Sequence, residues 1–309
     1  MRIAVMGAGG VGGYLGARLA AAGNDVHLIA RGAHLAALRA SGLRLRGVEP
    51  LDLPDIVATD DPATVGPVDL VLFCVKLYDT DAATAAVAPL VGADTMVLTL
   101  QNGIESVARI GAALGTQAVL GGAAYFPANI TAPGEVTYLG KIARMPHVAF
   151  GEPGGGPSTR TRRLARICED AGIEARVCDD TDLVLWEKFL LIAGTSATTT
   201  IARCTIGAVR DDPDLRWLLA AAIGEAARVG RAAGIALADD AEQRILDVLE
   251  TNPADGKSSQ LVDLENGKRL ELDGLSGAVV RMGRALAEPT PVHSTVYAAL
   301  KRYRDGPPR

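Results

Sequence analysis

Residues 2–13 read RIAVMGAGGVGG, an apolar run that leads directly into a glycine-rich turn. A helical pattern follows over Tyr14–Ala22 and ends at Gly23, and a second apolar run covers Asp25–Ala30. Strand, turn and helix in this order predict a βαβ unit, and glycines spaced G-x-G-x-x-G let the backbone approach a pyrophosphate. The stretch therefore predicts a dinucleotide-binding site at the start of the chain.

Each glycine of the turn has a separate expected role. Gly7 permits the tight turn, Gly9 lets the backbone come close to the pyrophosphate, and Gly12 allows the helix to pack closely on the strand. The N-terminus of the helix presents free N–H groups to the phosphates. A glycine turn with a structural role only is the alternative, and the strand–turn–helix context favours the cofactor. The residues expected to bind it here are Gly7, Gly9, Gly10, Val11 and Gly12.

The end of the second strand distinguishes NADPH from NADH. An acidic residue there binds the ribose 2′-hydroxyl of NAD, whereas an arginine accommodates the 2′-phosphate of NADP. This sequence has no acid at the tip of the strand and continues with Arg31, whose guanidinium can hold a phosphate through two hydrogen bonds. Lys76 follows the apolar run Leu70–Val75 and is expected to add positive charge at the same edge. A solvated role at the surface is the alternative for both residues, and NADP(H) is the favoured cofactor.

The rest of the first half alternates strand-like and helical patterns, as parallel βαβ units do. A further strand is expected at Thr95–Leu100, and crossover helices at Thr80–Val87 and Glu105–Leu114. Between Gly121 and Gly151, turn residues such as Pro133-Gly134 separate short β-prone pieces. This texture predicts antiparallel strands that extend the sheet.

A basic amphipathic helix at Thr159–Ala171 and a strand at Ile173–Val177 are expected to close the first domain. Beyond Asp180 the strand signal fades. The expected helices there are Leu183–Thr195, Asp214–Gly234, Ala241–Glu250 and Glu271–Ala287. The sequence thus predicts an α/β protein with a Rossmann-like, doubly wound NADP-binding domain over residues 1–180 and an all-helical domain for substrate and catalysis over residues 181–309.

Composition narrows the class further. The 309 residues are 49% hydrophobic with a net charge of −5, so no basic stripe suggests nucleic acid as a partner. No segment has the uncharged apolar length of a membrane span. Four cysteines and four histidines are dispersed, which argues against a disulfide framework or a metal site. We expect a soluble, cytoplasmic protein without a membrane partner, whose helical half offers faces for a homodimer.

The run Thr95–Leu100 ends in Gln101-Asn102-Gly103. Asn-Gly by itself is a turn signal, yet the Asn102 amide, which donates and accepts hydrogen bonds, is expected at the crevice where the nicotinamide lies. The glycine turn, Arg31, Lys76 and Asn102 come in the order seen in ketopantoate reductases (2-dehydropantoate 2-reductases), and the chain resembles this family.

The second half strengthens the resemblance. Residues 186–189 (WEKF) are similar to the family's W-x-K segment. Residues 257–263 (KSSQLVD) and 267–273 (GKRLELD) resemble its S-S-M-x-x-D and G-R-x-T-E-I-D signature. Residues 289–291 (PTP) are similar to its closing turn. The similarity spans nearly the whole chain.

The resemblance implies an oxidoreductase acting on CH–OH groups, which reduces a 2-oxo acid to a 2-hydroxy acid with NADPH. In this family ketopantoate becomes pantoate, in pantothenate biosynthesis. Lys188 would be the general acid, and Glu271 would bind the hydroxyl end of the substrate and help to hold the lysine. Ser259 would contact the substrate carboxylate, and Asn102 would bridge cofactor and lysine. Without the resemblance, Lys188 beside Glu187 reads as a surface pair.

Several positions depart from the family pattern. Ile192 and Ser196 follow Lys188 at i+4 steps, so they share its helix face and are expected to line the substrate pocket. The family usually carries asparagines there. Gly256 and Ile206 also stand where an amide or another polar residue is common. These changes leave open a second function, reduction of a different, less polar 2-oxo acid or ketone. A third alternative, a non-catalytic NADP sensor, would have no need of Lys188 and Glu271.

Overall fold

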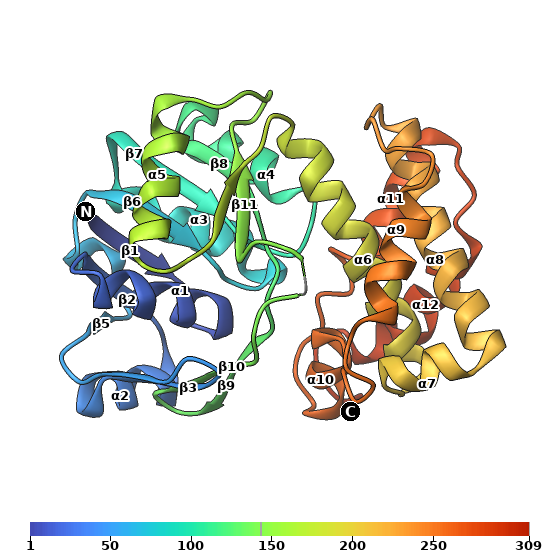
Figure 1. Ribbon diagram of the computed structural model, residues 1–309, viewed down its shortest axis with the longest axis horizontal. Helices are drawn as coiled ribbons and strands as arrows, with labels where there is room; N and C mark the ends of the chain where they lie inside the picture. Colours follow the sequence, from blue (N-terminus) through green and yellow to red (C-terminus); the bar gives the residue numbers. More distant parts are fainter. Residues whose placement is uncertain (143, 309) are drawn as a thin grey trace. The chain divides into compact units, whose positions relative to one another are not determined.

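The computed structural model describes residues 1–142 and 144–308. The chain forms two compact units: one comprises Met1–Gln101 and Glu105–Val184, and the other comprises Asn102–Ile104 and Leu185–Arg309. In the ribbon of Figure 1 the first unit is the α/β part and the second is helical. In the described part of the chain, no helix combines the length and the apolar character needed to cross a membrane.

The α/β unit is built on one large sheet. Its strands are β1 (Arg2–Met6), β2 (Asp25–Ile29), β5 (Val57–Thr59), β6 (Val68–Phe73), β7 (Val91–Thr99), β8 (Val119–Ala124), β11 (Val148–Gly151) and β12 (Ala175–Val177). The spatial order is β12-β11-β8-β7-β6-β1-β2-β5. The strands from β5 to β8 are parallel, whereas β11 pairs antiparallel with β8. From β1 the chain first adds strands on one side, β2 and β5, and then returns to add β6, β7 and β8 on the other side. This reversal of strand order beside β1 is the switch point of a doubly wound dinucleotide-binding fold.

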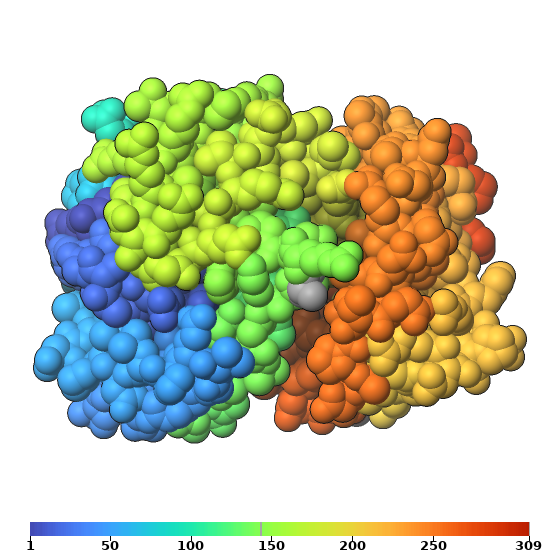
Figure 2. All heavy atoms as spheres, in the orientation of Figure 1, coloured from blue at the N-terminus to red at the C-terminus, as the bar shows by residue number. Residues whose placement is uncertain are grey.

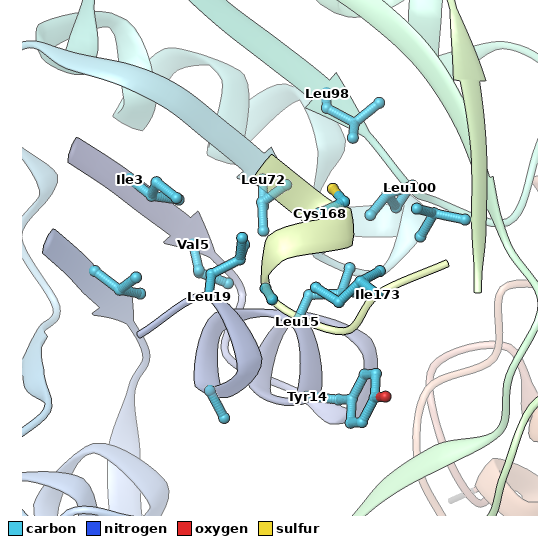
Figure 3. Close-up of a cluster of buried hydrophobic side chains, with 14 of the residues drawn as sticks. Ile3, Val5, Tyr14, Leu15, Leu19, Leu72, Leu98, Leu100, Cys168 and Ile173 are labelled. Atoms are coloured by element: carbon cyan, nitrogen blue, oxygen red, sulfur yellow. The ribbon is translucent and has the colours of Figure 1, made fainter. Parts of the chain in front are cut away.

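Helices cover both faces of this sheet because its central strands are apolar on both. The helices are α1 (Gly10–Ala21), α2 (Gly32–Ser41), α3 (Thr80–Val87), α4 (Ser106–Leu114) and α5 (Thr159–Asp170). Ile3 and Val5 pack with residues of α1 and α5 on one face, while Ala4 packs with residues of α3 and α4 on the other. Figure 3 shows the first of these clusters, which includes Leu15 and Leu19 of α1 and Cys168 of α5. The predicted doubly wound sheet is confirmed.

A second, four-stranded sheet was not predicted. Its strands are β3 (Leu43–Gly47), β4 (Leu51–Leu53), β9 (Ala128–Ala132) and β10 (Glu135–Tyr138), in the order β4-β3-β10-β9. The expectation that all the pieces between Gly121 and Gly151 extend the main sheet is correct for β11 and wrong for β9 and β10. Figures 1 and 2 show this hairpin, in green, beside the blue segment that carries β3.

The hairpin leaves the main sheet because its apolar face covers α1. Val136 and Tyr138 of β10 are buried, and the Tyr138 ring stacks on Tyr14 of α1 with 4.1 Å between centroids. The Tyr14 hydroxyl donates a hydrogen bond to Glu49, 3.0 Å away. Aromatic side chains bury a large apolar area and gain further from stacking, so this tertiary contact holds the hairpin against α1.

The second unit is helical. Its helices are α6 (Thr181–Ala202), which begins in the first unit, α7 (Ile206–Asp211), α8 (Pro213–Ala232), α9 (Ala241–Glu250), α10 (Ser259–Glu265), α11 (Ser276–Leu286) and α12 (Pro291–Leu300). Short 3-10 turns complete the chain: η1 (Pro62–Thr64), η2 (Leu77–Asp79), η3 (Ala88–Leu90), η4 (Thr116–Ala118) and η5 (Lys301–Tyr303).

The prediction of a helix from Glu271 was wrong at its start, because residues 272–275 form turns and the helix begins at Ser276. Leu275 N–H and Gly274 N–H both donate to the Glu271 carbonyl.

A buried carboxylate fixes the start of α12. The backbone N–H groups of Val292 and His293 donate to the two oxygens of Glu225 on α8, at 2.7 and 2.9 Å. The side chain of Glu225 is 2% exposed, and negative charge at a helix N-terminus is favourable. This contact joins α8 to α12 in the core of the helical unit.

His293 is fully buried beside this contact. Its Nε2–H donates to the Ala222 carbonyl at 3.0 Å, so Nδ1 accepts from the Ser276 hydroxyl at 3.2 Å. Burial lowers the pKa of His293 to about 4. The neutral ring therefore belongs to the folded state, and protonation favours the unfolded state.

We expect the free energy of unfolding to fall as the pH drops from about 6.5 towards about 4, because the unfolded chain binds a proton on His293 that the folded chain does not. Between pH 7 and pH 4.5 the loss from this group amounts to about 2 kcal/mol. Denaturant unfolding at pH 7 and pH 4.5 measures it, with His293→Gln as the variant that does not titrate. An equal pH dependence in both proteins would contradict the assignment.

Candidate functional site

The glycine turn after β1 has the close backbone contacts that its sequence predicts. Gly7 has φ +95°, and a Cβ there would lie 2.9 Å from the backbone nitrogen of Val75. A Cβ on Gly12 would overlap the Gly7 carbonyl oxygen. A Cβ on Gly9, in contrast, would meet nothing within 4 Å. The turn is therefore closed towards the sheet and open in front of Gly9, as the approach of a pyrophosphate requires.

The N-terminus of α1 is suited to an anion. Gly9 is its N-cap residue and supplies no side-chain hydrogen bond, and the first turn has no acidic residue. The first N–H groups of a helix lack partners within the helix, and the helix dipole favours negative charge there. The residues present in this turn therefore fit the diphosphate of a dinucleotide.

The predicted cationic residues lie at the same edge of the sheet. Arg31 follows β2 and is the N-cap residue of α2, and Lys76 follows β6 as the N-cap residue of η2. The Arg31 guanidinium, 82% exposed, contacts the Asp79 carboxylate at 2.5 Å. An exposed ion pair contributes at most about 1 kcal/mol, so Arg31 can exchange this carboxylate for a phosphate at small cost.

His34 on α2 holds the glycine turn from the side. Gly134 N–H can only donate, so it donates to His34 Nδ1 at 3.0 Å, and Nε2–H donates to the Ala8 carbonyl at 2.9 Å. Burial lowers the pKa of His34 below its usual 6.5, which favours this neutral ring. Sequence reasoning missed the residue, treating it as one of four dispersed histidines. Its position three residues after Arg31, on the helix that follows β2, is the signal that could have found it.

A buried glutamine fixes the end of β7. The Gln101 side-chain amide donates to the Val75 carbonyl at 3.0 Å and to the Thr80 hydroxyl at 2.9 Å. These bonds tie the end of β7 to the end of β6 and the start of α3. The next residue, Asn102, is partly buried and belongs to the helical unit.

The helical unit contains the predicted catalytic pair. Lys188 on α6 is 8% exposed and Glu271, in the segment after α10, is 6% exposed. Glu187 instead pairs with Arg244 of α9 at 3.2 Å. Lys188 is therefore a buried residue rather than an exposed one. Charged residues are seldom buried without a specific partner or function.

The start of α10 is joined to α6. The Ser258 hydroxyl lies 2.7 Å from the Thr199 hydroxyl and also caps α10 by accepting from Leu261 N–H. This bond fixes the start of α10 against α6, the helix that carries Lys188 and Ser196. Ser259 is exposed at the first position of α10, and Ser196 is 3% exposed.

Two of the positions that depart from the family pattern carry isoleucines, on α6 and at the start of α7. Ile192 is partly buried on α6 and Ile206, at the start of α7, is 5% exposed. Ile206 N–H donates to the Gly256 carbonyl at 2.8 Å.

The predicted residues fall into two groups. The α/β unit brings together the cofactor group, Gly7, Gly9, Gly10, Val11, Gly12, Arg31 and Lys76. The helical unit holds the group expected to act on the substrate, Asn102, Lys188, Ile192, Ser196, Ser259 and Glu271. A doubly wound sheet with an anion-binding glycine turn, combined with a helical unit that buries a lysine, defines a dinucleotide-dependent oxidoreductase.

Comparison with known proteins identifies the family. Residues 3–151 match the family described as ketopantoate reductase PanE/ApbA, and residues 180–304 match its C-terminal part. A 2-dehydropantoate 2-reductase of Mesorhizobium japonicum is 31% identical, with 98% of this chain and 97% of that protein covered. One of Archaeoglobus fulgidus is also 31% identical, covering 99% and 98%. The chain belongs to the ketopantoate reductase PanE/ApbA family.

Solved structures agree with this assignment. A PanE/ApbA family ketopantoate reductase of Ralstonia eutropha JMP134 superposes with a TM-score of 0.89 at 34% identity, covering 98% of both chains. A D-mandelate dehydrogenase has a TM-score of 0.88 at 21% identity and shows the shared fold alone. At the level of the family, the predictions of an α/β fold, of an NADP(H)-dependent oxidoreductase and of ketopantoate reductase chemistry are confirmed.

Proposed function

We propose that this protein reduces ketopantoate to pantoate with NADPH. The observation that carries the proposal is the burial of Lys188, at 8% exposure, on α6 of a chain that belongs to this family. Residues 1–180 would bind the cofactor and residues 181–309 would supply substrate contacts and catalysis.

In the proposed reaction the protein positions the substrate beside the cofactor and supplies a positive charge near its carbonyl oxygen. Bound NADPH supplies a hydride to the carbonyl carbon of the substrate. Negative charge then develops on the carbonyl oxygen, and the Lys188 ammonium both stabilises it and donates a proton from Nζ. In this proposal Glu271 binds the hydroxyl end of the substrate and helps to hold Lys188, while Ser259 binds the carboxylate. Asn102 bridges cofactor and lysine, and Ile192 and Ser196 line the pocket.

The cofactor contacts belong to the α/β unit. The N–H groups at the start of α1 would bind the pyrophosphate, with the open space in front of Gly9 as its approach. Arg31 would take the 2′-phosphate in exchange for Asp79, and Lys76 would add positive charge at this edge.

A less polar 2-oxo acid is the second candidate substrate. Ile192 and Ile206 place apolar side chains where the family commonly carries amides or other polar groups. Each missing hydrogen bond to the substrate lowers affinity by about 1 kcal/mol, and the loss falls on the hydroxyl of ketopantoate.

The proposal also includes a cytoplasmic location and a homodimer. The four cysteines are present as thiols, as is usual in a reducing compartment. Trp217 of α8 is 67% exposed, and aromatic side chains of this size are enriched in subunit interfaces.

A substrate panel tests the proposed function. With NADPH, we expect a higher kcat/KM for ketopantoate than for phenylpyruvate or 2-oxoisocaproate, because the predicted polar contacts of Glu271 and Ser259 serve only the first in full. Steady-state oxidation of NADPH at 340 nm is the measurement. Preference for either apolar acid would establish the second candidate and overturn the first.

Replacement of Lys188 tests the mechanism. We expect Lys188→Ala to lower kcat by about 100-fold or more, the usual scale for loss of a general acid, while the Kd of NADPH stays near its wild-type value. Lys301→Ala, at an exposed lysine of η5, is the control. Turnover near the wild-type rate in Lys188→Ala would exclude Lys188 as the proton donor.

Replacement of Arg31 tests the choice of cofactor. We expect Arg31→Ala to raise the KM of NADPH about tenfold or more, since a charge-assisted contact to phosphate is lost, and to leave the KM of NADH almost unchanged. Arg39→Ala removes an equal charge from α2 at a residue paired with Asp60. An equal rise for both cofactors would remove Arg31 from the 2′-phosphate site.

A further inference from the structure

We propose that His34 is a positioning residue of the dinucleotide site, which holds the glycine turn in its cofactor-binding conformation through the Ala8 carbonyl. This inference rests on the proposed binding of NADPH and adds a residue outside the glycine motif and its phosphate contacts. His34 lies on α2, in the unit that carries the turn.

The two ring nitrogens of His34 have different partners, and the partners fix their roles. Gly134 N–H is a donor, so Nδ1 carries no proton and accepts at 3.0 Å. The neutral ring then has its proton on Nε2, which donates to the Ala8 carbonyl at 2.9 Å. One imidazole thus links the turn after β1 to the tight turn between β9 and β10.

Ala8 is the residue whose peptide direction matters for the ligand. It stands between Gly7 and Gly9, and its own N–H donates to the Ile29 carbonyl at 3.1 Å. With its N–H bound to β2 and its carbonyl bound to His34, the peptide groups on both sides of Ala8 are fixed. Rotation of the peptide that follows Ala8 would change the direction of the Gly9 N–H, at the N-cap of α1.

The second sheet supports the same turn by contact. A Cβ on Gly10 would overlap the Ala128 carbonyl of β9, and a Cβ on Gly13 would lie 2.9 Å from the Val136 side chain of β10. The start of α1 therefore lies directly on this hairpin. The Gly134 carbonyl accepts from Arg44 N–H at 2.9 Å, which ties the hairpin turn to β3. His34 therefore links the second sheet to the glycine turn.

Two conservative substitutions separate the two bonds of His34. The amide nitrogen of His34→Gln reaches the position of Nε2 and keeps a donor for Ala8. The amide oxygen of His34→Asn reaches the position of Nδ1 and keeps an acceptor for Gly134. His34→Ala removes both, and His27→Gln on β2 makes the same change at another histidine of this unit.

The Kd of NADPH, from the quenching of tryptophan fluorescence or from calorimetry, is the primary measurement, together with the melting temperature. We expect about a fivefold higher Kd in His34→Ala and His34→Asn, on the scale of one lost hydrogen bond, and a Kd within about twofold of wild type in His34→Gln. At saturating NADPH, kcat should change less than KM in all three.

Binding of NADPH as tight in His34→Asn as in the wild type would overturn the inference, and so would equal weakening in His34→Gln and His34→Asn. Absence of NADPH binding by the wild-type protein would instead overturn the proposed function.

Discussion

The structure depends on the close approach of α1 to β1, which only glycine permits. A side chain at Gly12 would overlap the Gly7 carbonyl, and one at Gly10 would overlap the Ala128 carbonyl. Removing these two clashes lets one helix lie against the main sheet and against the β9–β10 hairpin at once. The same turn leaves open space in front of Gly9, the N-cap residue of α1, so the glycines that allow the close packing also suit this helix N-terminus to an anion.

The first half of the chain was largely predictable because its signals are local. Helix α3 begins and ends at the residues that the sequence pattern predicts, and in the second half so does α9. Each is a short periodic run bounded by a turn or a capping residue, and such runs specify their own secondary structure. The Rossmann-like order of strands then follows from the right-handed connections of parallel βαβ units.

The hairpin β9–β10 was not predictable in the same way. Its residues have the alternation of a strand pair, and alternation does not tell which sheet a strand joins. The choice depends on Tyr14 of α1, whose ring packs against the rings of Tyr138, Phe126 and His147. Long-range packing of this kind leaves no trace in a local window, and His34, whose two partners are 26 and 100 residues away, escaped for the same reason.

The candidate catalytic residues, in contrast, were found from the sequence, while their burial was not. Residue type and spacing found Lys188 and Glu271 through the family motif, but the sequence alone read the lysine as a surface residue beside Glu187. The structure pairs Glu187 with Arg244 and leaves Lys188 only 8% exposed on α6. A buried lysine loses hydration that a surface lysine retains, and this loss lowers the stability of the fold. A lysine without a function would therefore be expected at the surface. In this protein the burial of Lys188 turns a family motif into an argument for a proton donor.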